Sequence, residues 1–425
     1  MASMQQFHQA YVLPSFKDAV PESWRSNSAP KPPASSLQTV VISSLSGNQI
    51  ASGHTDLSLP LGPSAGIMSQ AYIKFTVAVA TGGATDAVRF KGAQHSALAL
   101  INRYTTSING ISLDTIANFD QSAGDLQNHC TSNDWLKNDA AVLMGANVTF
   151  TAAASAFTET FCIPLFGFLA GTIPSYLLNG QLNIGIDWNP AARAFYSAAG
   201  TVTGYTISGV QLIYDRISPS QEFIDTVKAE LRGGQKFVIP YVNIQNVNVG
   251  TTQTSNNLSV GVNYSSLRSL LMSQVLAADY TTIANEGLSL NYGMAQFQVS
   301  CDGRLLSAVT YDTVNSPALA FLEAQKSCGR AFDASISDPC AYLVAANAAS
   351  TVQVRSYLTN NFFAGCSGLR VNEQLAFAGT PVSVLQLNWT DNALPGGGAS
   401  VNCNITLLAD MQALVDENGN VTIYR

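Results

Sequence analysis

The second half of this chain repeats the order of turns, helices and strands found in its first half. In each half a strand ends in a glycine turn, a helix-like stretch follows, and three further strands complete the series. The corresponding segments are 107–110, 124–137, 161–165, 182–188 and 205–215 in the first half, and 300–303, the stretch from 317, 357–358, 387–389 and 407–410 in the second. An offset of about 200 residues relates the two series, which indicates two β domains of similar length in tandem.

The strands are predicted by alternation of side chains. Along 73–79, Ile73, Phe75, Val77 and Val79 alternate with polar or small residues, a period of two that places one face in a core. Segments 182–188, 210–215 and 295–301 follow the same rule. A parallel sheet would need a helix after each strand, whereas these strands are separated mainly by turns. The pattern therefore predicts an all-β protein built as a sandwich or jelly roll.

One clear amphipathic helix lies between the two halves. We expect Ser218 to cap it, with Pro219 at the first helical position and Gln221 completing a capping box. Its apolar face is formed by Phe223, Val227 and Leu231, and it ends at Gly233-Gly234. The segment is expected to be a connector with one apolar side.

Residues 1–36 show no strand or helix period and contain five prolines, so we expect an extended N-terminal arm. The arm also carries large apolar residues, namely Phe7, Tyr11, Leu13, Phe16 and Trp24. A solvated linker does not require such residues, which favours a segment that becomes ordered against a neighbour. A partly disordered tail is the alternative interpretation.

Composition excludes several classes of function. With 425 residues, 47% of them hydrophobic and 11% charged, the chain can bury substantial cores. The net charge is −7 and the 20 basic residues are scattered, so we expect no direct sequence-specific binding of nucleic acid. We find neither a secretory signal nor an apolar run long enough to span a bilayer. The seven cysteines lack CxxC pairs and are expected to be free, buried thiols.

Motifs for catalysis are mostly absent, and we expect no enzyme, no cofactor and no metal site. The four histidines lack metal-ligand spacing, and 365–368 lacks the second glycine of a nucleophile elbow. Paired carboxylates, as in a glycosidase, are the remaining enzymatic option, with Glu159, Asp187, Asp215 and Glu323 as nominees. Trp135, Trp188 and Trp389 could line a sugar site, although core packing explains two of them in corresponding strands better.

Taken in order, several segments resemble those of viral double jelly-roll major capsid proteins. In the first half they are the apolar Ile-Pro-Leu strand of 161–168, Ile173-Pro174, the strand 183–186, and the strand 205–215 followed by the connector helix. In the second half they are the Cys301-Asp302-Gly303 turn, Asn361-Phe362-Phe363 and the hairpin of 416–422. Within the lineage of adenoviruses, tailless phages and giant viruses, the chain looks nearest to polinton-like viruses and virophages.

The resemblance implies two tandem jelly-roll barrels, a double jelly roll, with short helices in loops. The expected division is an arm over 1–36, a first jelly roll over 37–217, a connector helix over 218–233 and a second jelly roll over 234–425. Such proteins form homotrimers of nearly hexagonal outline that tile an icosahedral shell. Neighbouring capsomers are the implied partners, with penton and minor capsid proteins and an internal membrane as further candidates. The implied location is the virion, after synthesis in the host cytoplasm.

Two other readings remain open. One is a β-sandwich carbohydrate-binding protein, which should present exposed tryptophan or tyrosine to a sugar. The other is a glycosidase on the same scaffold, which should direct two carboxylates into one cleft.

Overall fold

The computed structural model describes residues 36–425 except 45, 48, 51, 84–85, 93–95, 132–134, 136–137, 153–155, 288, 290–293, 307–309, 314–316, 329–361, 368–378 and 392–398. The arm, the strand expected at 357–358 and part of the predicted stretch 124–137 therefore lie outside the described residues.

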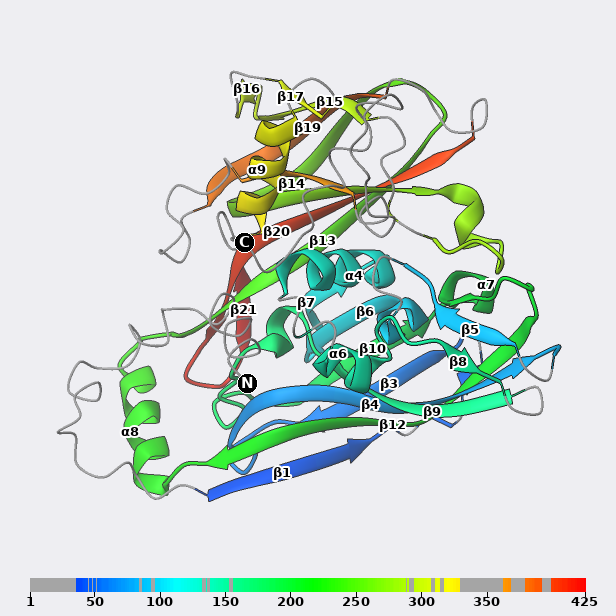
Figure 1. The fold of residues 1–425 in the computed structure, drawn as a ribbon. Helices are drawn as coiled ribbons and strands as arrows, with labels where there is room; N and C mark the ends of the chain where they lie inside the picture. Colours follow the sequence, from blue (N-terminus) through cyan, green and yellow to red (C-terminus); the bar gives the residue numbers. More distant parts are fainter. Residues whose placement is uncertain are drawn as a thin grey trace.

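The first half is a sandwich of two antiparallel sheets. One sheet has the order β1 (Ser36–Ser43), β12 (Val202–Ser218), β4 (Ile67–Thr81) and β9 (Ala156–Pro164), with β2 (Gln49–Ile50) also on β12. The other has the order β3 (His54–Pro60), β10 (Gln181–Trp188), β6 (Ile101–Ile108) and β7 (Ile111–Ile116). Short strands β5 (Ala87–Phe90), β8 (Phe150–Thr151) and β11 (Phe195–Tyr196) form a small third sheet. Figure 1 shows the two main sheets in the lower part of the molecule.

The alternating residues of these strands lie on the inner and outer faces that the sequence predicts. Ile73, Phe75, Val77 and Val79 are buried, whereas the residues between them on β4 are partly exposed. Trp188 on β10 is buried in the same core, where its ring meets that of Phe75 edge to face at 5.2 Å. Its indole N–H donates to the Thr55 hydroxyl at 2.9 Å, so burial leaves no unsatisfied donor there. Each such large apolar side chain contributes about 2 to 3 kcal/mol through burial.

The second half repeats this strand order. Its strands are β13 (Phe237–Thr251), β14 (Ser255–Leu276), β15 (Met294–Cys301), β16 (Arg304–Leu305), β17 (Tyr311–Asp312), β18 (Phe363–Cys366), β19 (Thr380–Asp391), β20 (Val401–Val415) and β21 (Val421–Tyr424). The order β13, β20, β14, β18 matches β1, β12, β4, β9 of the first half. The early part of β14 pairs with β19, and its later part pairs with β20 and β18. Through this one long strand the nine described strands of the second half form a single hydrogen-bonded sheet.

Helices occupy loops, as expected. They are α4 (Phe119–Cys130), α6 (Asp139–Met144), α7 (Ala191–Ala194), α8 (Gln221–Arg232) and α9 (Pro317–Ser327), with 3-10 turns η1 (Ala97–Leu100), η2 (Gly167–Ala170) and η3 (Ala277–Tyr280). The α4 and α9 helices both precede the fourth strand of their sheet, β9 and β18. The helix predicted from 124 begins earlier, at Phe119.

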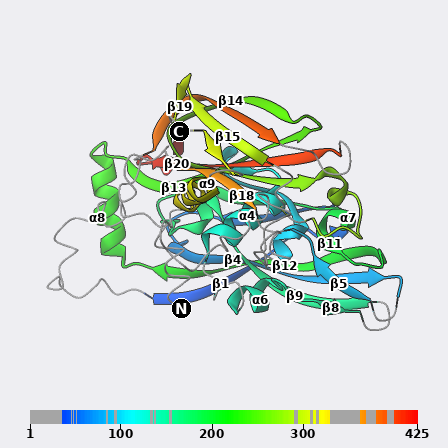
Figure 2. The same cartoon turned by 45° about the horizontal axis from the view of Figure 1, so that its top comes forward.

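The connector helix α8 exists, but its predicted cap is wrong. Ser218 is the last residue of β12, and the cap is Ser220, whose hydroxyl accepts from the Phe223 N–H at 3.4 Å. Pro219 therefore lies before the helix, between strand and cap. Val227 and Leu231 are buried as the apolar face requires, and Figure 2 shows α8 at one side of the molecule.

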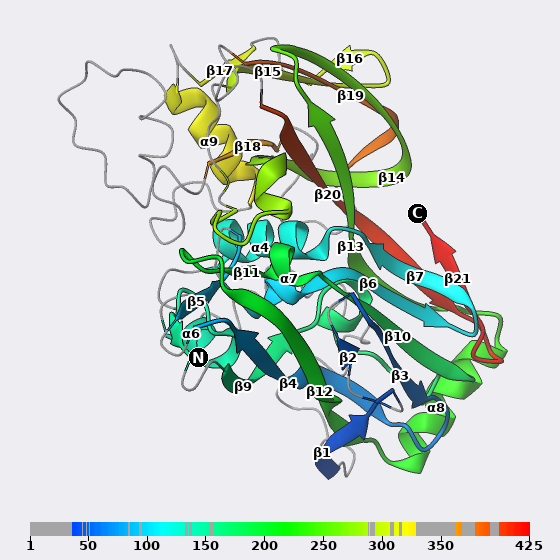
Figure 3. The ribbon, with the colours of Figure 1, turned by 90° about the vertical axis from the view of Figure 1, so that its right-hand side faces the viewer.

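The two halves contact each other along most of their length. In Figure 3 the second jelly roll lies above the first, with α4 between them. The turn between β20 and β21 reaches back to the first half, where the Asn179 N–H donates to the Gly419 carbonyl at 3.1 Å. Five of the six cysteines that the structure describes are buried.

The Gly419 turn provides a test of this contact. Gly303 and Gly419 both have positive φ, at 77° and 78°, but a Cβ on Gly303 would meet open space, whereas one on Gly419 would lie 2.7 Å from the Leu177 carbonyl oxygen. Gly303→Ala should therefore cost about 1 kcal/mol of unfolding free energy from backbone strain alone. Gly419→Ala should cost about 3 kcal/mol because it adds a clash between the halves. Equal losses in guanidinium unfolding would contradict the contact.

Candidate functional site: the seam between the jelly rolls and the outer surface

The arm residues Phe7, Tyr11, Leu13, Phe16 and Trp24 lie outside the described residues, so the structure does not test them. A functional site must therefore be sought among the described residues of the two jelly rolls. Within the described ranges no cluster of three or more histidine, cysteine or acidic side chains is arranged to hold a metal ion. In the same ranges no helix has the length and apolar character needed to span a bilayer. The described features that remain are the contact between the halves, which we call the seam, and the outer surface.

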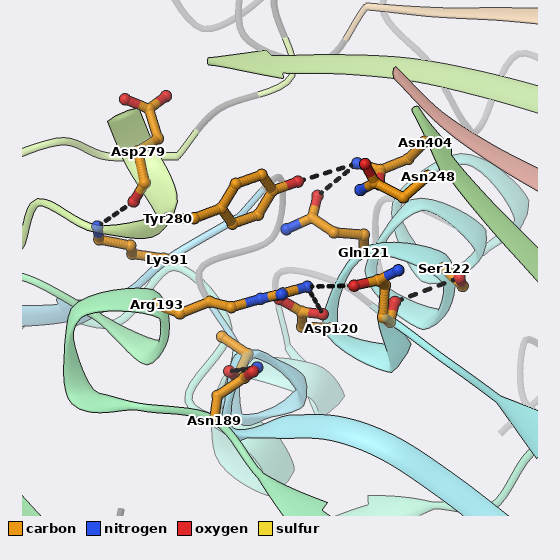
Figure 4. Close-up of polar contacts among 12 residues, drawn as sticks. Lys91, Asp120, Gln121, Ser122, Asn189, Arg193, Asn248, Asp279, Tyr280 and Asn404 are labelled. Atoms are coloured by element: carbon orange, nitrogen blue, oxygen red, sulfur yellow. Dashed lines mark hydrogen bonds and ion pairs between the residues drawn. The ribbon is translucent and has the colours of Figure 1, made fainter. Parts of the chain in front are cut away.

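Arg193 is central to the seam (Figure 4). It lies on α7 in the first half and donates to both carboxylate oxygens of Asp120 on α4, at 2.7 and 2.8 Å. Its guanidinium also lies over the ring of Tyr280, 4.7 Å from the centroid, and Tyr280 belongs to the second half. The planar, permanently charged guanidinium suits both contacts at once. One arginine therefore links the two jelly rolls.

A chain of polar side chains extends this contact. Asn404 on β20 donates through its amide to the Tyr280 hydroxyl at 3.1 Å and to the Gln121 side-chain oxygen at 3.4 Å. Nearby, Asn118 donates to the side-chain oxygen of Asn246 on β13 at 3.0 Å. The partners lie on α4 or beside it in the first half, and on β13, η3 or β20 in the second. The N-terminal end of α4 is thus held by the second jelly roll.

Lys91 crosses the seam at its other end. The buried ammonium donates to the backbone carbonyls of Asp279 and Thr282, each at 2.6 Å. Burial lowers the pKa of Lys91 to about 8, against the attraction of the Asp279 carboxylate. Beside it, Arg89 forms an ion pair with Glu286 at 2.7 Å. These bonds hold the loop after η3 onto the first half.

Two buried carboxyl groups complete the seam. Asp125 on α4 accepts from the Ser273 hydroxyl on β14 at 2.5 Å, and burial raises its pKa to about 7. Asp114 on β7 accepts from Thr106 and from the Phe168 N–H, each at 2.8 Å, and burial raises its pKa to about 7 as well. Buried acids of this kind favour the protonated form. The seam is therefore polar, and the raised pKa values make its stability depend on pH.

The raised pKa values predict the direction of pH dependence. An acid with pKa near 7 in the folded chain and its ordinary low value when unfolded binds more protons folded, so stability falls as pH rises from about 4 to about 7. Asp125→Asn should reduce the loss of unfolding free energy between pH 5 and pH 8 by an amount on the order of 2 kcal/mol. The exposed Glu230→Gln on α8 is the control and should leave the pH profile unchanged. An unchanged profile in both variants would contradict a buried acid at Asp125.

The structure does not support a two-carboxylate cleft among the nominated acids. Asp187 lies on β10, whereas Asp215 and Glu159 lie on β12 and β9 of the opposite sheet. Asp187 is bound by His54 and Asp215 accepts from the Thr39 hydroxyl at 2.9 Å. Glu323, on α9 of the second half, accepts from Ser367 at 2.6 Å. The four acids lie on four different elements, and Asp187, Asp215 and Glu323 each have a local partner.

The tryptophans considered for a sugar site are core residues. Trp135, Trp188 and Trp389 are all buried, at 5%, 1% and 2% exposure. A sugar-binding ring must present its face to solvent, so the three rings provide no platform of that kind.

Sequence reasoning missed an ion-pair cluster on the surface of the first half. The two ring nitrogens of His54 lie 2.5 Å from an Asp187 oxygen and 3.0 Å from an Asp56 oxygen. Burial lowers the pKa of His54, but the bonds to both carboxylates and their charges outweigh it and raise the pKa. The cluster joins β3 to β10. The antiparallel pairing of these strands, which brings Asp187 opposite His54, was not visible in the sequence.

The outer surface carries isolated large apolar side chains. The most exposed are Val142, Leu37, Tyr424, Leu305 and Val41. Of these five residues, Leu37 and Val41 lie on the same strand, β1, and are 70% and 51% exposed.

No family model matches the chain, and no curated protein matches it. Several solved structures match the chain. PBCV-1 VP54, fitted into a reconstruction of the virophage Sputnik, aligns with a TM-score of 0.63 at 10% identity over 95% of this chain and 99% of that one. The Faustovirus major capsid protein aligns with a TM-score of 0.61 at 10% identity over 91% of each chain. The mavirus major capsid protein aligns with a TM-score of 0.53 at 12% identity over 95% of this chain and 94% of that one.

These alignments cover both halves together with the seam. The chain therefore has the double jelly-roll fold of viral major capsid proteins, as the resemblance implied. The order of strands in its two halves is an independent observation of the same duplication.

Proposed function

We propose that the chain is a major capsid protein whose homotrimers tile an icosahedral viral shell. The observation that carries the proposal is the double jelly roll itself, matched over 91% or more of this chain by capsid proteins of other viruses. Two similar barrels per chain give six per trimer and a nearly hexagonal outline. Such a block tiles a flat face through repeated lateral contacts, so one gene product covers a large area. Function then depends on surfaces rather than on a catalytic pocket, and we propose no enzymatic activity.

The composition supports lateral assembly through uncharged contacts. Only 11% of residues are charged, while interfaces between subunits are depleted of lysine and acidic side chains. Neighbouring capsomers are the main proposed partners, with penton and minor capsid proteins and an internal membrane as further ones. The proposed location is the virion, after synthesis in the host cytoplasm. The division into 1–36, 37–217, 218–233 and 234–425 is part of this proposal.

Oligomeric state is the first test. The purified chain should have three times the mass of one chain in light scattering, because trimers are the assembly unit. Raising salt from 0.1 to 1 M should leave the trimer intact, since screening weakens exposed ion pairs but not apolar or hydrogen-bonded contacts. Negative-stain images should show particles of hexagonal outline. A stable monomer at micromolar concentration would overturn the proposal.

The arm is the second test. Deleting residues 1–35 should spare trimers and prevent shells, because the alternating strands begin only after the arm while its apolar residues need a neighbour to cover them. The melting temperature of the truncated trimer should change little. A full-length variant with serine at Phe7, Tyr11, Leu13, Phe16 and Trp24 controls for chain length and should behave like the deletion. Loss of trimers would place the arm in the trimer core, and normal shells would make it dispensable.

A further inference from the structure

The outer edge of β1 is open. Its eight residues pair with β12 in one continuous register, from Ser36 with Ser218 to Ser43 with Gln211. Among the described residues β12 is the only strand hydrogen-bonded to it, so β1 is the last strand of its sheet. Figures 1 and 3 both place it at the margin of the molecule. An edge of this kind presents a row of backbone N–H and C=O groups that can pair with another chain.

This edge lacks the features that normally prevent such pairing. Proteins protect edge strands with charged side chains, prolines or bulges. Two other outer strands of the first half have them: β3 carries Asp56 and Pro60, and β9 carries Glu159 and Pro164. The sequence of β1, SLQTVVIS, has neither charge nor proline, and its register with β12 shows no shift.

The face beside the edge carries apolar residues on either side of the Thr39–Asp215 hydrogen bond. Leu37 and Val41 point to the outer side of the sheet, where they are 70% and 51% exposed. Their partners on β12 are Ile217 and Ile213, both only partly buried. Ile67 on β4, paired with Ile217, continues the strip. A strand added to β1 would cover Leu37 and Val41 with its own side chains on that face.

The chain itself contains a segment suited to this edge. Residues 7–13, Phe-His-Gln-Ala-Tyr-Val-Leu, contain no acid, lysine, arginine or proline, and they place Phe7, Tyr11 and Leu13 on one side of an extended strand. Seven residues match the eight of β1 in length. The 22 residues between Leu13 and Ser36 are rich in proline and can span roughly 70 Å when extended.

We propose that residues 7–13 of one copy of the chain add as a strand to the open edge of β1 in a second copy. The proposal rests on the proposed function, because it names the place where the arm binds when copies assemble. A second copy is favoured over the same copy because Pro30, Pro32 and Pro33 come shortly before β1 in the sequence. Proline favours extended backbone, which opposes a tight return of the segment onto the same edge.

Hydrogen–deuterium exchange on the full-length chain tests the proposal. Peptides that cover residues 5–13 and 36–43 should both be protected in assembled shells, and both should exchange at least tenfold faster in dissociated chains. The double variant Leu37→Lys/Val41→Lys should remove protection at 5–13, because charge on an edge strand opposes pairing. The reciprocal variant Tyr11→Lys/Leu13→Lys leaves β1 unaltered and should remove protection at 36–43. Val142→Lys on α6, an equally polar change at an 82% exposed position, is the control and should change neither.

The outcomes separate this inference from the proposed function, because light scattering on the same samples reports assembly independently. Fast exchange at 5–13 in shells of the natural chain would overturn strand addition while leaving the capsid role intact. Protection at 5–13 that survives the β1 variant, with shells present, would place the arm elsewhere. Protection that persists on dilution to dissociated chains would assign the segment to its own copy and overturn the proposal. A chain that stays monomeric under all conditions would instead refute the proposed function.

Discussion

Buried charge between the two jelly rolls determines how the halves can be arranged. Asp120 and Lys91 are buried and Arg193 is partly buried, and a buried charge is tolerated only when its partners are in place. Those partners come from both halves: Tyr280 lies under the guanidinium, and the Asp279 carbonyl accepts from the ammonium. Sliding or rotating one jelly roll on the other would leave these groups unpaired, at a cost of about 3 to 5 kcal/mol for a broken buried pair. These contacts therefore favour one arrangement of the two jelly rolls.

The strands could be predicted from the sequence because alternation is a local signal. Ile73 to Val79 on β4 and the corresponding run on β10 are buried on the side that the period of two requires. The seam could not be predicted, because Asp120 and Arg193 are 73 positions apart and Asn404 lies 283 positions from Gln121. Nothing near any of these residues in the sequence identifies its partner. The connector helix lies between these cases: its existence was predicted, but serines stand on both sides of Pro219, and the prediction chose Ser218 where the cap is Ser220.

The two jelly rolls share a fold, but their corresponding strands have different surroundings. Strands β1 and β13 occupy the same place in their sheets, each beside the last long strand of its half. In the second half, β13 lies in the seam: Tyr241 donates to the Leu113 carbonyl at 3.1 Å, and its ring meets Phe168 edge to face at 5.4 Å. In the first half, β1 faces outward. The same element is thus covered in one jelly roll and open in the other.

This difference has a consequence for assembly. Because Tyr241 packs β13 into the seam, a trimer of double jelly rolls would present only three exposed edges of the β1 type. Like β1, β13 is the last strand of its sheet, and Pro240 removes a backbone donor from it, which opposes pairing with another chain. A block with six barrels would then expose only three equivalent edges at its margins, even though its proposed outline is nearly hexagonal. Directional contacts between blocks can follow from that mismatch, because alternate sides of the outline differ in the strand that they expose.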